Sequence, residues 1–265
     1  MSIQIDRDGA ITVIAIDRPA KRNAVDPATA RALRDAFAAF AADETARVAI
    51  LTGCGGHFCA GFDLTAVGAT RYDPEAPGPM GPTRMLLEKP VIAAVEGHAV
   101  AGGLELALWC DLRVAAESAI FGVYCRRWGV PLIDGGTVRL PRIVGQGRAL
   151  DMILTGRPVD AAEAQRIGLA DRVVPDGTAL PAAIALARQI AAFPQICLNS
   201  DRMSAYRQWD FDLEAALAHE AHAGVAPLRE GAAAGAKRFT DGAGRGGSFA
   251  AFGESEMHFP PNSSP

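Results

Sequence analysis

The sequence lacks the features of a membrane or secreted protein. It has no run of 18 uncharged apolar residues, the length that a membrane-spanning helix needs. The first residues, Met1 to Arg7, alternate apolar with polar side chains, whereas a signal peptide has a charged start and an apolar stretch. The five cysteines show no paired spacing, and the chain is too long to need disulfides for stability. We therefore expect a cytoplasmic protein that contacts no membrane.

An excess of positive charge is also missing. The formal net charge is −4 and the pI is about 5.8, which argues against a broad nucleic-acid-binding surface. An anionic ligand would have to be held by a local basic group. The spacing of Cys54, His57, Cys59 and His98 fits no common zinc pattern. We therefore expect neither a nucleic-acid partner nor a metal.

What is present is the composition of a globular domain, with 49% hydrophobic and 21% charged residues in a chain of 265. Residues 3–5 and 11–16 read as paired strands around an Asp8-Gly9 turn. A helix is predicted over residues 28–42, with Asp26 as N-cap and Pro27 at the first helical position. Buried strands at 48–52 and 91–95 and a helix over 104–110 continue the pattern, which predicts a mixed α/β core.

Two stretches break this alternation. Residues 71–82 are rich in Pro and Gly and predict a loop without regular structure, which is a candidate cover for a binding site. After Pro194 the pattern is helical only, so we expect a core over residues 1–193 and a helical C-terminal region over 194–265. Its tail, from Asp241 onward, is rich in Gly, Ser and Pro and is expected to be flexible.

The segment with the clearest chemical content is His98 to Leu106, where small residues lead into a predicted helix. The N-terminus of a helix presents unsatisfied N–H groups, and Gly102 leaves room for a reacting oxygen to reach them. Glu105 lies three positions later on the same face, so donor and carboxylate converge. An oxyanion hole needs two donors. The Gly-rich segment 52–64, which follows a strand, is the candidate for the second.

These segments resemble the enoyl-CoA hydratase/isomerase (crotonase) superfamily in register and in order. The similar stretches are residues 17–24 (DRPAKRNA), 58–64 (FCAGFDL), 89–103 (KPVIAAVEGHAVAGG) and 154–174. The resemblance implies an α/β fold, a crotonase-like ββα spiral core with a helical C-terminal appendage. It also implies an acyl-CoA thioester as substrate, with coenzyme A as part of the substrate and not as a separate cofactor.

By this resemblance the oxyanion donors are the backbone N–H groups of Phe62 and Gly102, and Glu105 is one of two acid–base carboxylates. Arg22, in the loop after a strand, is a candidate for pairing with the CoA phosphates. Ala60 and Cys125 are further candidate substrate-binding residues. The C-terminal helices imply a homotrimer or a hexamer.

The sequence departs from the pattern of hydratases at one position, where Cys125 stands in place of the second carboxylate. A thiol normally stays protonated near pH 7. Asp134 offers a substitute, and two interpretations are open: it replaces the lost carboxylate, or it is the N-cap of the next helix. We expect an enoyl-CoA hydratase; the alternatives are a double-bond isomerase and an acyl-CoA-binding protein without hydratase activity.

Overall fold

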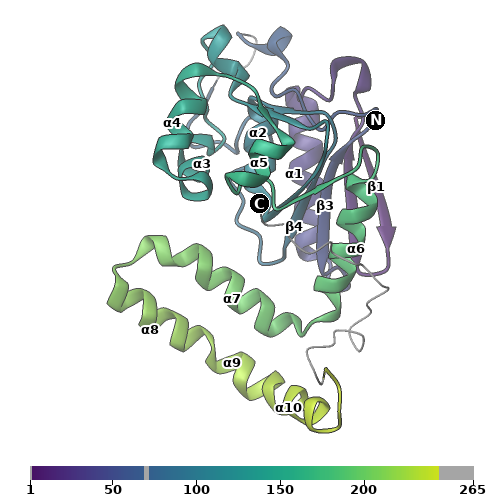
Figure 1. Ribbon diagram of the computed structural model, residues 1–265, viewed down its shortest axis with the longest axis vertical. Helices are drawn as coiled ribbons and strands as arrows, with labels where there is room; N and C mark the ends of the chain where they lie inside the picture. The colour runs from purple at the N-terminus through teal and green to yellow at the C-terminus, as the bar shows by residue number, and fades with distance from the viewer. Residues whose placement is uncertain (1, 69–71, 245–265) are drawn as a thin grey trace, which may run out of the picture. The chain divides into compact units, whose positions relative to one another are not determined.

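The computed structural model describes residues 2–68 and 72–244 (Figure 1). The chain divides into two compact units, Met1–Ala187 and Arg188–Pro265. The boundary expected from sequence, at residues 193 and 194, lies a few residues further along the chain.

A six-stranded sheet runs through the N-terminal unit in the order β1-β2-β3-β4-β6-β9. Only β1 and β2 pair antiparallel; the other neighbours are parallel. The predicted hairpin is confirmed, with Gly9 at φ 59° in its turn. The strands are β1 (Ile3–Asp8), β2 (Ile11–Ile16), β3 (Val48–Gly53), β4 (Val91–Val95), β6 (Leu112–Ala116) and β9 (Arg172–Val174).

Helix α1 (Pro27–Ala42) begins as the sequence predicts. The Asp26 carboxylate accepts the N–H of Thr29 at 2.8 Å, and Pro27 needs no donor of its own at this position. Its buried face carries Leu33, Phe37 and Phe40. The helix packs against the N-terminal strands, as Figure 1 shows.

A second, three-stranded sheet has the order β5-β7-β8. Strand β5 (His98–Val100) pairs parallel with β7 (Ile120–Gly122), which pairs antiparallel with β8 (Val159–Asp160). Helix α2 (Gly102–Trp109) follows β5 directly, and all of its residues are buried. Because Trp109 packs edge-on against Phe37 with ring centroids 4.7 Å apart, α2 is fixed against α1.

The remaining helices of this unit are α3 (Gly136–Val144), α4 (Gln146–Thr155), α5 (Ala161–Arg166) and α6 (Ala179–Ala192), the last of which ends in the C-terminal unit. Short 3-10 turns lie at η1 (Pro19–Lys21), η2 (Leu64–Ala66) and η3 (Tyr124–Trp128). Residues 72–82 contain no helix or strand, as their Pro and Gly content predicts.

The C-terminal unit is helical as far as it is described. It contains α7 (Gln195–Arg207), η4 (Gln208–Asp210), α8 (Leu213–Ala223), α9 (Val225–Pro227), a π-helical turn η5 (Leu228–Ala232) and α10 (Ala233–Thr240). Most of the expected flexible tail, residues 245–265, lies outside the described residues. Within the described chain no single helix has the length and apolarity to cross a membrane. One bent pair of helices, Ala179–Ala192 with Gln195–Asp210, reaches the required length and apolarity when the two are taken together.

Candidate active site

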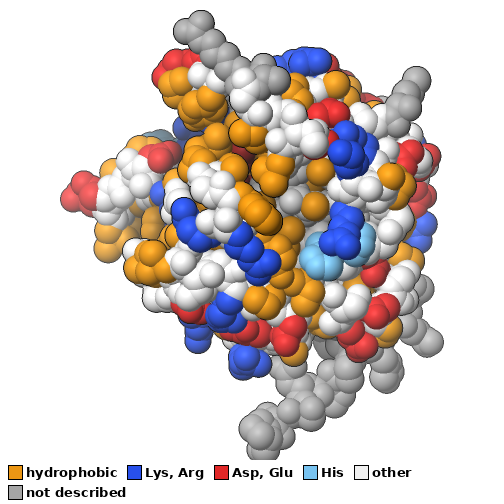
Figure 2. Space-filling model, turned by 90° about the horizontal axis from the view of Figure 1, so that it is seen from above, with side chains coloured by type: hydrophobic (Ala, Val, Ile, Leu, Met, Phe, Trp, Pro, Cys, Tyr) orange, Lys and Arg blue, Asp and Glu red, His pale blue; other side chains and the backbone are white. Residues whose placement is uncertain are grey.

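The seven residues singled out from the sequence line one cavity of about 640 Å³ in the N-terminal unit. They come from five parts of the chain and are Arg22, Ala60, Phe62, Gly102, Glu105, Cys125 and Asp134. Figure 2 shows a face on which hydrophobic side chains gather along a hollow, with Lys and Arg side chains beside it. The cavity therefore combines an apolar wall with a small number of polar groups, as ligand sites commonly do.

The two predicted oxyanion donors lie on neighbouring, parallel stretches of backbone. Cys59 pairs with Ala99: the Cys59 N–H donates to His98 O at 2.9 Å, and the Val100 N–H donates to Cys59 O at 3.1 Å. Further along, Gly61, the residue before Phe62, lies beside Ala101 and Gly102. The approach is close, since a Cβ added to Gly61 would lie 3.0 Å from the nitrogen of Gly102.

Within the described residues, neither the Phe62 N–H nor the Gly102 N–H has a hydrogen-bond acceptor. Gly102 is the first residue of α2, and Ala101 before it has a positive φ of 54° that turns the chain from β5 into the helix. Both groups border the cavity. Two unsatisfied N–H donors on one cavity form a site for a developing oxyanion.

The surroundings of Gly103, at the start of α2, require a glycine. A Cβ at Gly103 would overlap the carbonyl of Cys59, and a Cβ at Gly102 would lie 2.6 Å from Sδ of Met80. The absence of a side chain at Gly102 and Gly103 therefore allows the two backbone stretches to meet.

Glu105, one turn after Gly102, is buried, and its Oε1 accepts two backbone N–H groups. These donors are Asp134 at 2.8 Å and Gly136 at 2.9 Å, both in the turn that leads into α3. Burial and, to a lesser degree, the nearby Asp134 carboxylate raise the pKa of Glu105 to about 7. A carboxyl group with this pKa can give or take a proton near neutral pH.

Asp134 is also buried, and the N-cap interpretation is wrong. The N-cap of α3 is Gly135, at φ 96°, and it makes no side-chain capping bond. The Asp134 Oδ1 instead accepts the N–H of Met80 at 3.0 Å and the hydroxyl of Thr83. Burial raises the pKa of Asp134 above its ordinary value. The structure thus places a second carboxyl group on the cavity beside Glu105.

Cys125 lies on η3 and borders the same cavity, with 6% of its surface exposed. Burial raises the pKa of its thiol, and the charge of Glu105 acts in the same direction. It is therefore a neutral thiol near pH 7, and it brings no carboxylate to the cavity.

Arg22 and Ala60 are joined by a backbone bond from the Ala60 N–H to Arg22 O at 2.9 Å. Arg22 has a left-handed φ of 47° and an exposed guanidinium at the cavity. The pKa of the nearby His98 imidazole is lowered mainly by burial, then by the charge of His57 and then by that of Arg22. A positive charge that lines the cavity is suited to an anionic group of a ligand.

Comparisons with known proteins decide the family. The sequence profile described as "Enoyl-CoA hydratase/isomerase" matches residues 6–239. The chain is 43% identical over 198 residues to enoyl-CoA hydratase EchA19 of Mycobacterium tuberculosis, covering 71% of this chain and 74% of that protein. The chain belongs to the enoyl-CoA hydratase/isomerase family.

Other members of the family extend the match. Carnitinyl-CoA dehydratase of Salmonella arizonae is 39% identical over 232 residues, which cover 82% of this chain and 88% of that protein. The crystal structure of enoyl-CoA hydratase EchA1 from Mycobacterium marinum superposes with a TM-score of 0.86 at 35% identity, over 91% of this chain and 96% of that one. The predicted crotonase fold, a mixed α/β core with C-terminal helices, is confirmed.

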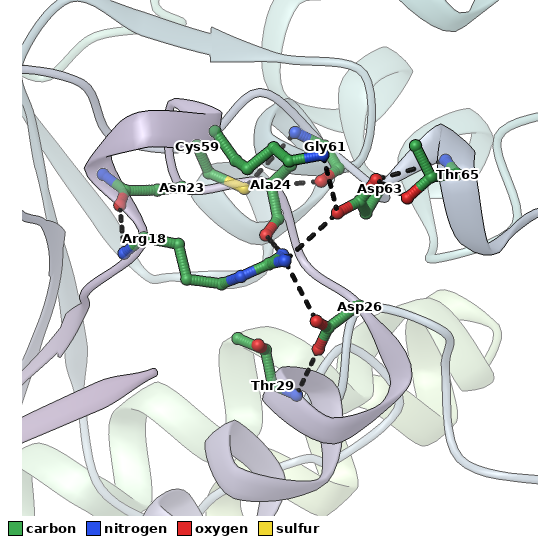
Figure 3. Close-up of polar contacts among 10 residues, drawn as sticks. Arg18, Asn23, Ala24, Asp26, Thr29, Cys59, Gly61, Asp63 and Thr65 are labelled. Carbon is green, nitrogen blue, oxygen red and sulfur yellow. Dashed lines mark hydrogen bonds and ion pairs between the residues drawn. The ribbon is translucent and has the colours of Figure 1, made fainter. Parts of the chain in front are cut away.

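Arg18, which connects two loops beside the cavity residues, was not singled out from the sequence. The Arg18 guanidinium contacts the carbonyl of Ala24 and bonds to Asp26 at 3.0 Å and Asp63 at 3.1 Å (Figure 3). It thereby ties the loop after β2 to the residue that follows Phe62. The available signal was its place in the family-like segment 17–24, but Asp63 lies 45 residues further along the chain, too far for a local pattern to reveal.

Met80 and Thr83 were not singled out either. They lie in and just after the Pro- and Gly-rich loop, which was recognised only as a stretch without regular structure. Their contacts with Asp134 span 54 and 51 residues of sequence, and no sequence motif predicts these contacts.

Proposed function

We propose that this protein hydrates the double bond of a 2-enoyl-CoA thioester through an enolate held in the Phe62–Gly102 oxyanion hole. The observation that carries the proposal is the convergence of two acceptor-free N–H groups and two buried carboxyl groups, Glu105 and Asp134, on one cavity. Relatives named as a hydratase and a dehydratase support a reaction that adds or removes water.

In this mechanism the thioester oxygen lies between the Phe62 and Gly102 N–H groups. As water adds to the β carbon, negative charge develops on that oxygen, and the two donors stabilise it. Removing one such donor in other enzymes costs roughly 10²–10³ in rate. The Arg22 guanidinium pairs with a phosphate of CoA, and the Ala60 segment borders the bound thioester.

The two carboxyl groups share the proton transfers. Each has one oxygen fixed by donors, Oε1 of Glu105 and Oδ1 of Asp134. One group in its base form takes a proton from water as the C–O bond forms at the β carbon. The other, in its acid form, gives a proton to the α carbon. A pKa of about 7 suits Glu105 to either role.

Double-bond isomerisation is the second candidate, and Cys125 is the observation that favours it. With a neutral thiol in place of the usual carboxylate, Glu105 could act as a single base that moves a proton between two carbons of the acyl chain. In that case Asp134 would have no part in proton transfer.

A panel of 2-enoyl-CoA and 3-enoyl-CoA thioesters with product identification tests these functions. Hydration predicts 3-hydroxyacyl-CoA from crotonyl-CoA, isomerisation predicts a shifted double bond without water, and binding without turnover across the panel would contradict both. For hydration we expect a bell-shaped pH profile and a fall in turnover of ~10²–10⁴ in Asp134→Asn. Wild-type hydration by that variant would remove Asp134 from the mechanism.

A further inference from the structure

The Asp134 carboxylate is hydrogen-bonded to residues 80–83, a segment that lies outside the family-like stretches of the sequence. Its Oδ1 accepts the Met80 N–H and the Thr83 hydroxyl, which reach it across more than 50 residues of sequence. Thr83 is 1% exposed and Asp134 3%, so no solvent competes for this bond. A hydrogen bond made in such surroundings is electrostatically stronger than one in water.

Arg139 on α3 reinforces the same connection. Its guanidinium donates to the carbonyl of Thr83 at 2.7 Å and to the carbonyl of Asp134 at 3.0 Å. Arg84 adds a bond to the carbonyl of Ile133 at 3.4 Å. The segment around Thr83 and the turn that carries Asp134 are therefore linked through both side chain and backbone.

This turn is also the one that binds Glu105, through the N–H groups of Asp134 and Gly136. A continuous chain of contacts thus runs from Thr83 through Asp134 to Glu105. We therefore expect a change in how Thr83 holds Asp134 to affect both carboxyl groups of the cavity.

The backbone of Gly78 packs against the Asp134 oxygen that accepts the Thr83 hydroxyl. A Cβ added to Gly78 would overlap both the Thr83 hydroxyl and Oδ1 of Asp134. Oδ1 is thus enclosed by protein, while the other carboxylate oxygen, Oδ2, has no hydrogen-bond partner among the described residues, and the residue borders the cavity. The arrangement leaves Oδ2 for substrate or water.

We propose that Thr83 is a positioning residue, whose hydroxyl orients the Asp134 carboxylate and favours its ionised form. The inference rests on the proposed use of Asp134 as an acid–base group. Thr83 does not touch the reacting atoms; it acts through the oxygen that faces away from them.

The charges around Asp134 set the direction of the effect. Glu105 on α2 opposes its ionisation, while Arg139 on α3 and Arg84 next to Thr83 favour it, and Cys125 on η3 faces Glu105 as a neutral thiol. The Thr83 hydroxyl bonds to the ionised form and so lowers the pKa of Asp134 against the raising effect of burial. Without this hydroxyl the carboxylate accepts its proton at higher pH. The acid limb of the rate profile therefore moves upward.

The test compares the pH profile of kcat/KM for crotonyl-CoA hydration in the full chain with those of Thr83→Val and Thr83→Ser. We expect Thr83→Val to move the acid limb upward by about one pH unit, which is roughly tenfold in rate below that limb. Thr83→Ser keeps the hydroxyl and should restore the wild-type profile. If Thr83→Val does not fold, as judged by thermal unfolding, Thr83→Ala serves as the second deletion of the hydroxyl.

Thr12→Val is the matched control. Thr12 is a buried threonine on β2 whose hydroxyl has no partner among the described residues, so its loss should leave the profile in place. An equal fall in rate at every pH for Thr83→Val, with an unmoved acid limb, would overturn the proposal.

Asp134→Asn in the same assay separates this inference from the proposed function. Wild-type hydration by Asp134→Asn would overturn both. A large loss in Asp134→Asn together with an unshifted profile in Thr83→Val would overturn only the role of Thr83.

Discussion

Glu105 shows how a single side chain can gain reactivity at the expense of stability. It is 2% exposed, and the two N–H groups at its Oε1 only partly offset the loss of hydration of its charge. Its pKa of about 7 lies above the ordinary value of 4.5. Between these pH values the folded protein binds more protons than the unfolded chain, so the stability contributed by this group is complete at low pH and is lost as the pH rises through 7.

Glu105→Gln tests this linkage directly. The amide oxygen of Gln can accept the same two N–H groups, but it does not titrate. A pKa difference of one unit corresponds to about 1.4 kcal/mol. Between pH 4.5 and pH 7 we therefore expect the free energy of unfolding of the wild type to fall, relative to this variant, by up to about 3 kcal/mol. Urea titrations at several pH values measure the difference. Glu117→Gln, at an exposed position, is the control; a pH-independent difference for Glu105→Gln equal to that of the control would contradict the account.

At the scale of elements, the proposed oxyanion hole depends on how closely α2 approaches the Cys59 segment. Gly103→Ala places a Cβ onto the Cys59 carbonyl, and because backbone cannot rotate away, one of the two stretches must shift. We expect a loss of about 1–3 kcal/mol in stability, the usual cost of overpacking, together with a fall in kcat/KM of ~10-fold or more as the Phe62 and Gly102 donors separate.

Gly147→Ala on α4 is the matched helical control. A Cβ there meets open space, so the substitution should stabilise the helix by up to ~1 kcal/mol and leave turnover unchanged. Thermal unfolding and crotonyl-CoA turnover of both variants measure the contrast. Equal behaviour of the two glycine variants would contradict the close approach.

The same elements show what the sequence could reveal. Helix α1 follows from Asp26 and Pro27, because capping is local, and the Gly-rich entry to α2 with Glu105 one turn later is likewise a local pattern. The partners of Asp134 are not local. A residue followed by Gly-Gly before a helix resembles an N-cap, and only the fold shows that its carboxylate bonds to Met80 and Thr83 instead. The sequence pattern therefore identified the residue but not its surroundings.

At the scale of the whole molecule, we propose that the C-terminal helical region, from residue 194 onward, mediates assembly into a homotrimer or a hexamer. Large apolar side chains are exposed along its helices, and such surfaces commonly mark protein interfaces; they include Trp209, Phe211, Leu213, Leu217, Leu228 and Phe239. Light scattering at micromolar concentration should give three or six times the chain mass of 27.7 kDa. A monomer would contradict this prediction.

We propose that the cavity stabilises the enolate of a CoA thioester while Glu105 moves a proton at its α carbon. Exchange of the α protons of butyryl-CoA in deuterated water, followed by NMR, isolates this step, because a saturated thioester can be neither hydrated nor isomerised. We predict exchange with the wild type and a rate at least ~10² lower with Glu105→Gln, the size of a general acid–base contribution. Exchange at the wild-type rate in Glu105→Gln, or no exchange by a wild type that binds the thioester, would contradict the account.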